Sequence, residues 1–181
     1  MGEIAPAGGA FRRDLAPSVD VTPLPSRVGS VKHLSGTASA RIETPIEDCF
    51  ALLAALEGYP AWYQEVVTAV DVVEYGDDGV PARAETTLHL SYGPISRDLD
   101  LLLAVRLSRP GLVQLTHVPR GASSGASFDA TWRLQDGDGT RLQLELDATM
   151  PLPALVPVGN VGDSFAAGFM QAAVQRLEPG S

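Results

Sequence analysis

The sequence predicts an α+β fold in which a curved antiparallel sheet wraps around a long C-terminal helix. Apolar and polar residues alternate through much of residues 67–150, and this period of two is typical of strands. Short turns rich in Gly, Pro and Asp separate the strands, so consecutive strands must pair antiparallel. Apolar residues cover more than half of the circumference of residues 160–177, which indicates a helix buried on most of its surface.

The N-terminal residues 1–29 show neither a helical nor a strand period. They contain four Pro and four Gly, and their positive and negative charges balance. We therefore expect a flexible tail, followed by one domain over residues 30–178. A role of this tail in recruiting a partner is the alternative.

The domain begins with a strand and two short helices. Residues 33–43 alternate, which predicts the first strand. The tetrapeptide Thr44-Pro45-Ile46-Glu47 has the pattern of a capping box with Pro at the first helical position. It predicts a helix over 47–56 that ends at Gly58, and a second short helix begins at Tyr59.

Six further strands follow, and each has one polar and one apolar face. Such strands form a sheet with one wet face and one buried face, and its twist would curl it around the long helix. The predicted strands cover residues 67–75, 82–92, 95–107, 112–118, 127–134 and 140–150.

Composition excludes several classes of protein. There are 13 Lys and Arg against 22 Asp and Glu, a net charge of -9, so binding to nucleic acid is not expected. A single cysteine, Cys49, rules out an intramolecular disulfide, a thiol zinc cluster and a CxxC redox pair. No apolar run is long enough to span a membrane, and no secretory signal is visible, so we expect a cytoplasmic protein. Nucleotide and metal motifs are missing, and we expect no cofactor and no metal.

Two stretches carry a resemblance to a known family. The first stretch is Thr44-Pro45-Ile46-Glu47 followed by Glu57-Gly58-Tyr59-Pro60-Ala61-Trp62. The second, late in the sheet, consists of Phe128, Ala130, Trp132, Leu134 and Gly139-Thr140. Both occur within the order strand, two short helices, six strands and long helix. Together they resemble the START-like, or SRPBCC, superfamily, in its polyketide cyclase/dehydrase and coenzyme Q-binding branch. The resemblance covers roughly residues 33–177. It implies a helix-grip fold with a pocket for a hydrophobic lipid, quinone, polyketide or steroid, but no single reaction.

Small residues at inward positions favour such a pocket independently, because small residues facing one another leave volume. The alternative is that they let the helix and the sheet pack closely. They are Gly36, Ala38, Ala40, Ala84, Ala126, Ala130 and Ala148 on the strands, and Gly162 and Gly168 on the helix.

Three polar residues are candidates for chemistry in the pocket. Arg97 is in phase with inward leucines, Tyr92 ends its strand inward, and His117 shares a face with Leu115. The alternatives are that Arg97 snorkels out at the strand end and that Tyr92 and His117 are structural. The full predicted ligand-binding set is Trp62, Tyr63, Leu88, Leu90, Tyr92, Arg97, Leu99, His117, Phe128, Trp132, Phe165 and Phe169.

Other motifs have simpler interpretations. The G-x-S-x-G match at residues 121–125 leads into a strand, so it is a small-residue loop and not a nucleophile elbow. Asp136-Gly137-Asp138-Gly139 is a hairpin turn, because it lacks the remaining ligands of a calcium loop. The pair Asp98 and Asp100 and the imidazole of His89 lie on polar strand faces, and Cys49 is an inert buried thiol.

These observations lead to one main hypothesis and two alternatives. The main hypothesis is a carrier, chaperone or sensor, monomeric or homodimeric, that binds a hydrophobic small molecule. The first alternative is an aromatase/cyclase-like enzyme in which Arg97 polarises a carbonyl while Tyr92 or His117 moves protons. The second is a protein-interaction module that uses the tail or the acidic surface.

Overall fold

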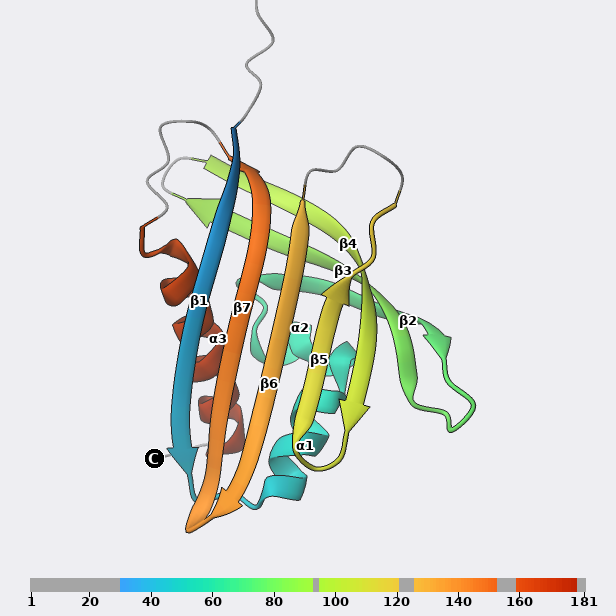
Figure 1. Ribbon diagram of the computed structural model, residues 1–181, viewed down its shortest axis with the longest axis vertical. Coiled ribbons are helices and arrows are strands. Elements are labelled where there is room, and N and C mark those ends of the chain that lie inside the picture. The colour runs from blue at the N-terminus through green and yellow to red at the C-terminus, as the bar shows by residue number, and fades with distance from the viewer. Residues whose placement is uncertain (1–29, 93–94, 121–125, 153–158, 179–181) are drawn as a thin grey trace, which may run out of the picture.

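A computed structural model describes residues 30–92, 95–120, 126–152 and 159–178 of the chain. Its seven strands form one antiparallel sheet in the order β1-β7-β6-β5-β4-β3-β2, and this sheet curves around a long C-terminal helix (Figure 1). The predicted fold class is therefore confirmed. The strands are β1 (Ser30–Ile42), β2 (Val67–Tyr75), β3 (Pro81–Tyr92), β4 (Ile95–Ser108), β5 (Leu112–His117), β6 (Ser127–Gly137) and β7 (Gly139–Leu152).

The helices are α1 (Ile46–Ala54), the 3-10 turn η1 (Leu56–Gly58), α2 (Tyr59–Trp62) and α3 (Val161–Leu177). The predicted capping box is wrong, because Pro45 occupies the N-cap position and makes no side-chain cap hydrogen bond. The hydroxyl of Thr44 donates instead to the carbonyl of Leu177 at 3.4 Å, and the hydroxyl of buried Thr140 donates to the carbonyl of Thr44 at 2.7 Å. Thr44 thus connects the start of α1 to α3 and β7.

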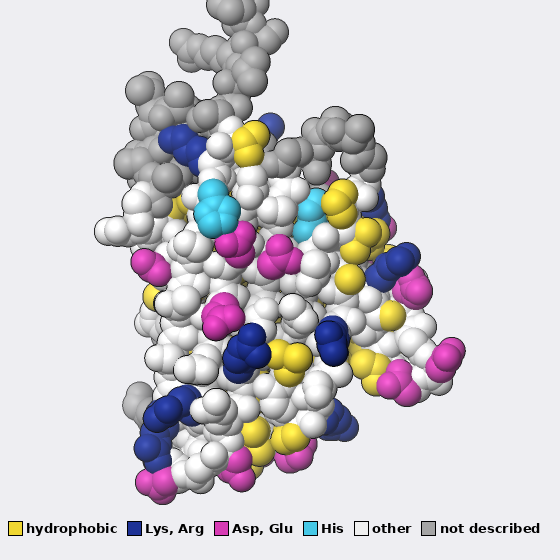
Figure 2. Space-filling view, viewed as in Figure 1, with side chains coloured by type: hydrophobic (Ala, Val, Ile, Leu, Met, Phe, Trp, Pro, Cys, Tyr) yellow, Lys and Arg dark blue, Asp and Glu magenta, His cyan; other side chains and the backbone are white. Residues whose placement is uncertain are grey.

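The two faces of the sheet differ as the alternation predicts. Leu142, Leu144 and Leu146 of β7 are buried, while Arg141, Glu145 and Asp147, which alternate with them, are exposed. Figure 2 shows acidic, basic and histidine side chains spread over the outer face, with only scattered hydrophobic ones. In Figure 1, which has the same view, the helix α3 lies behind the sheet and covers its inner face.

The helix α3 contacts the edge strand β1 at very short range. A Cβ atom added to Gly36 would lie 2.1 Å from the carbonyl oxygen of Gly162, and one added to Gly162 would lie 2.1 Å from that of Ser35. The backbone amide of Thr37 also donates to the carboxylate of Asp163 at 3.3 Å. At this contact the small residues serve close packing, which is the alternative interpretation of the sequence pattern.

Several sequence predictions concern the turns and the ends of the chain. The turn at residues 136–139 is a hairpin between β6 and β7 with Gly139 at a φ of 82°, where glycine is favoured. The tail 1–29 and the G-x-S-x-G match at 121–125 lie outside the described residues. Within the described ranges, no helix has the length and apolar character that a membrane span requires.

Candidate ligand-binding site

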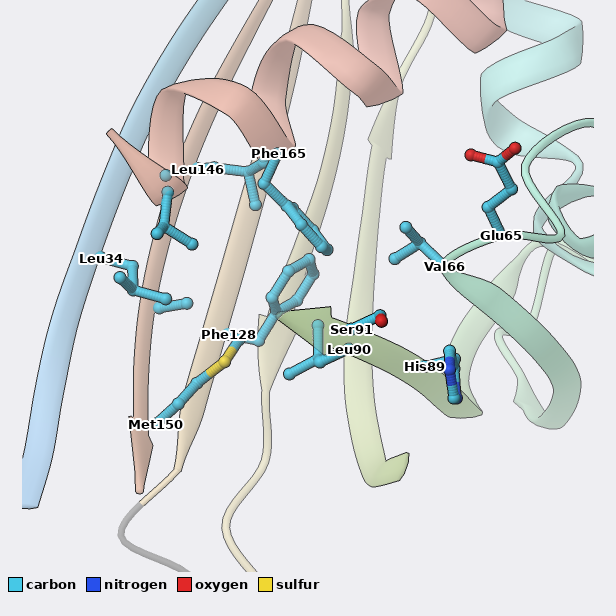
Figure 3. A pocket seen from close by; sticks show the side chains of 13 residues that line it. Leu34, Glu65, Val66, His89, Leu90, Ser91, Phe128, Leu146, Met150 and Phe165 are labelled. Carbon is cyan, nitrogen blue, oxygen red and sulfur yellow. The ribbon is translucent and has the colours of Figure 1, made fainter. Parts of the chain in front are cut away.

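A cavity of about 300 Å³ lies between the inner face of the sheet and the N-terminal half of α3 (Figure 3). This volume is at the lower end of the range of small-molecule sites. Phe128 and Phe165 both line it and pack edge to face against one another, with ring centroids 6.5 Å apart. The complete lining consists of Leu34, Glu65, Val66, His89, Leu90, Ser91, Phe128, Leu146, Ala148, Met150, Val161, Gly162 and Phe165.

Deeper in the interior, side chains fill nearly all of the space. A void of only about 20 Å³ remains there, and Phe128 and Leu146 line both this void and the larger cavity. Trp132, Leu144 and Phe169 contribute to its wall. The helix-grip interior is thus divided into an upper cavity with room for a ligand and a packed lower core.

Aromatic rings close the lower end of the cavity. Phe169 is the centre of this group, with ring centroids 4.3 Å from Tyr63, 5.7 Å from Phe165 and 6.4 Å from Trp132. Tyr59 anchors the group through its hydroxyl, which donates to the carbonyl of Leu53 at 2.7 Å. The indole Nε1 of Trp62 is buried and has no hydrogen-bond partner within the described part of the chain.

The polar lining residues lie where the sheet opens. The strand β2 begins at Val67, so β3 continues from His89 to Tyr92 without β2 beside it, and the last link is the bond from the His89 amide to the Val66 carbonyl at 2.6 Å. Glu65, His89 and Ser91 therefore form a polar rim at this open edge. Ser91 also lines an adjoining groove of about 520 Å³ that includes Tyr63 and the start of α3, so the cavity opens here.

The rim histidine is held by a carboxylate. His89 Nδ1 lies 2.6 Å from the Oδ1 atom of Asp98, its partner across β3 and β4, and 38% of the His89 side chain remains exposed. Sequence alternation predicts that the His89 side chain lies on the outer face, and its contact with the exposed Asp98 agrees with this prediction. The sequence does not show that β2 begins only at Val67, and this start leaves His89 among the residues that line the cavity.

The predicted ligand-binding residues are distributed over three regions. Leu90, Phe128 and Phe165 line the cavity, whereas Leu88, Trp132 and Phe169 line the small deep void. Tyr63 lines the adjoining groove. Trp62 and Leu99 are partly buried and pack against the core without lining the cavity.

The structure does not gather the three predicted catalytic candidates around the cavity. Arg97 pairs with Leu90 in register, which agrees with the predicted phase, but its side chain is exposed and does not line the cavity. His117 is half-buried opposite Leu103 and also lies outside the lining. Tyr92 ends β3, and its side chain lies outside the described residues.

The other candidate groups from the sequence are either buried or exposed away from the cavity. The thiol of Cys49 is fully buried, and burial raises its pKa, which suppresses the reactive thiolate. The carboxylates Asp98 and Asp100 are exposed, and Asp100 accepts a hydrogen bond of 2.8 Å from the hydroxyl of Thr87. Over the described ranges, no group of His, Cys, Asp and Glu side chains is arranged to hold a metal ion.

Burial makes Tyr63 sensitive to alkaline pH. Desolvation, with a smaller contribution from the charge of Glu65, raises the pKa of Tyr63 to about 12. The neutral phenol therefore stabilises the folded state below its unfolded pKa of about 10, and this contribution is lost as pH rises toward 12. We expect wild type to lose about 1 kcal/mol more unfolding free energy than Tyr63→Phe between about pH 9 and 11.

Urea denaturation of both proteins at each pH measures this difference. Tyr75→Phe is the matched control, because Tyr75 is 54% exposed on β2. Equal pH dependence of wild type and Tyr63→Phe would contradict the assignment.

Comparisons with known proteins agree with this architecture. The model of the family described as polyketide cyclase / dehydrase and lipid transport matches residues 33–179. A search of curated proteins finds no match. Among solved structures, a START superfamily protein from Mycobacterium smegmatis has a TM-score of 0.64 and 17% identity, covering 82% of this chain and 99% of that one.

Two further solved structures show the breadth of the fold. Major latex-like protein 151 from Panax ginseng has a TM-score of 0.58 at 12% identity, covering 81% of this chain and 99% of that one. The di-domain ARO/CYC BexL from the BE-7585A biosynthetic pathway has a TM-score of 0.57 at 12% identity, covering 81% of this chain and 50% of that one. At such identities these structures share the fold alone. The family match, in contrast, spans most of the sequence, and the chain belongs to the family described as polyketide cyclase / dehydrase and lipid transport.

Proposed function

We propose that this protein binds a hydrophobic small molecule in the cavity between the sheet and α3, and acts as its carrier, chaperone or sensor. The cavity itself carries the proposal. Its volume is about 300 Å³, and ten of its thirteen lining residues are apolar or glycine. An apolar cavity of this size lowers the stability of a protein, because interiors otherwise pack densely, so its presence favours a function in binding.

The positions of the predicted catalytic residues support binding more than catalysis. The cyclase alternative relies on Arg97 as its main residue, and Arg97 does not line the cavity. His117 does not line it either. The ARO/CYC protein BexL is similar in fold, and this similarity assigns no catalytic residue to this chain. The carrier, chaperone or sensor function therefore accounts for the cavity with fewer assumptions.

Native mass spectrometry of protein purified from its own host tests the proposal. We expect a bound mass that is released by organic extraction and that competes with an environment-sensitive fluorophore for the cavity. A protein that carries no bound mass and also fails to bind the fluorophore would overturn the proposal. Turnover of a released polyketide-like molecule would favour the cyclase instead.

A further inference from the structure

We propose that Phe128 forms the floor of the cavity and thereby limits its ligand to a compact apolar ring system of about two fused rings. This inference rests on the proposed function, because it specifies the class of ligand that the same cavity accepts. Three observations carry it: the level at which the lining changes from the cavity to the deep void, the burial of Phe128, and the volumes of the two spaces.

The lining changes from the cavity to the deep void at the same level on four elements. Phe128 of β6 and Leu146 of β7 line both spaces. They are diagonal neighbours on adjacent strands, since Phe128 pairs with Ala148 and Ala130 pairs with Leu146. On one side of this level the residues line the cavity but not the void, and on the other side the reverse holds. The former are Leu90, Ala148, Met150 and Phe165, and the latter are Leu88, Ala130, Trp132, Leu144 and Phe169.

The side chain of Phe128 lies on the inner face of the sheet at this level. It is 2% exposed, and burial along β6 alternates so that Phe128, Ala130 and Trp132 are buried while the residues between them are more exposed. Its ring packs edge to face against that of Phe165 on α3 (Figure 3). A phenyl ring held between the sheet and the helix blocks the path from the cavity to the void.

The two volumes define the size of the ligand. The cavity measures about 300 Å³, whereas the void beneath Phe128 measures only about 20 Å³. An apolar cavity of about 150 Å³ holds one benzene molecule, so the larger space has room for about two fused rings. The void has room for about one water molecule. A long chain therefore cannot continue along α3 into the lower core while Phe128 is in place.

Two probes that share a naphthalene frame and differ in chain length test the floor: 2-methylnaphthalene and 2-butylnaphthalene. Displacement of an environment-sensitive fluorophore measures both affinities. In wild type we expect them to agree within about threefold, because the longer chain finds no buried space. In Phe128→Ala the affinity ratio of the butyl to the methyl probe should rise about tenfold or more, since each buried methylene group strengthens binding about fourfold.

Nuclear magnetic resonance locates the chain. In Phe128→Ala the terminal methyl group of 2-butylnaphthalene should show nuclear Overhauser contacts to the indole protons of Trp132, which lines the void but not the cavity. Phe165→Ala is the matched control, because it also removes a phenyl ring from the cavity lining, but Phe165 does not line the void. We expect no contact to Trp132 in Phe165→Ala or in wild type.

A second variant covers a loss of stability in Phe128→Ala, which removes a buried ring. Phe128→Val keeps a residue that favours a strand and opens the floor less widely. The affinity ratio should rise in the same direction, by a smaller factor. Circular dichroism establishes that each variant is folded before its affinities are compared.

Several results would overturn the inference while leaving the proposed function intact. They are a ratio that does not rise in the folded Phe128 variants, a rise without a contact to Trp132 in Phe128→Ala, and a contact of the butyl chain to Trp132 in wild type. Binding of the fluorophore but of neither naphthalene would also overturn it, because the cavity would then accept a ligand of another shape. If wild type binds neither the fluorophore nor the naphthalenes, the proposed function fails as well.

Discussion

Gly162→Ala should lower the free energy of unfolding by about 3 kcal/mol or more, the largest effect on stability that we expect from a single methyl group. The new Cβ would lie 2.1 Å from the carbonyl oxygen of Ser35 and 2.5 Å from its carbonyl carbon. Both atoms belong to the backbone of β1, which cannot rotate away as a side chain can. The start of α3 would have to move off the sheet.

A second glycine of α3 provides the control. A Cβ at Gly168 would lie 2.7 Å from the hydroxyl of Tyr63, which is the far end of a side chain. Alanine also favours a helix over glycine by up to about 1 kcal/mol, so Gly168→Ala should stay within about 1 kcal/mol of wild type. Urea denaturation of the two variants measures the contrast, and equal stabilities would show that the helix does not touch β1 as described.

Ala148→Phe should abolish binding of naphthalene-type probes, the largest effect on binding that we expect. Ala148 is buried on the inner face of β7, pairs with Leu34 and Phe128, and lines the cavity. A phenyl ring at this position would occupy the space of a ligand. Because the ring enters an existing cavity, the free energy of unfolding should change by less than about 1.5 kcal/mol.

The neighbouring position on the same strand controls for this substitution. Thr149 faces the other side of the sheet, where it pairs with His33 and Ser127. Thr149→Phe should leave the affinity for naphthalene unchanged, as measured by calorimetry or by displacement of a fluorophore. Binding that persists in Ala148→Phe would place the ligand outside this cavity.

The fold could be predicted from the sequence because its signals are local and repeated. Alternation in β7 distinguishes the buried Leu142, Leu144 and Leu146 from their exposed neighbours, and the apolar face of α3 requires a partner layer. The capping box was not predictable in the same way. The hydroxyl of Thr44 bonds to Leu177, which is distant in sequence, and this tertiary contact replaces the local cap.

The site was predicted less well, since it depends on where strands end relative to one another. The phase of Arg97 agrees with the register, but no local pattern shows that its side chain is exposed beyond the cavity. His89 shows the opposite case. Its alternation places it on the polar face, and only the start of β2 at Val67 leaves it at an open edge and makes it a lining residue.

The backbone contact between Gly36 and Gly162 has a mechanical consequence for the cavity. Two main chains in direct contact leave no side chain that can be compressed or rotated, so the β1 side of the cavity is a rigid wall. We therefore expect any widening of the cavity to occur at the opposite wall, where the His89 amide of β3 donates to the Val66 carbonyl. The β1 wall of the cavity would thus stay fixed when a ligand enters, and the wall that carries the polar rim would move.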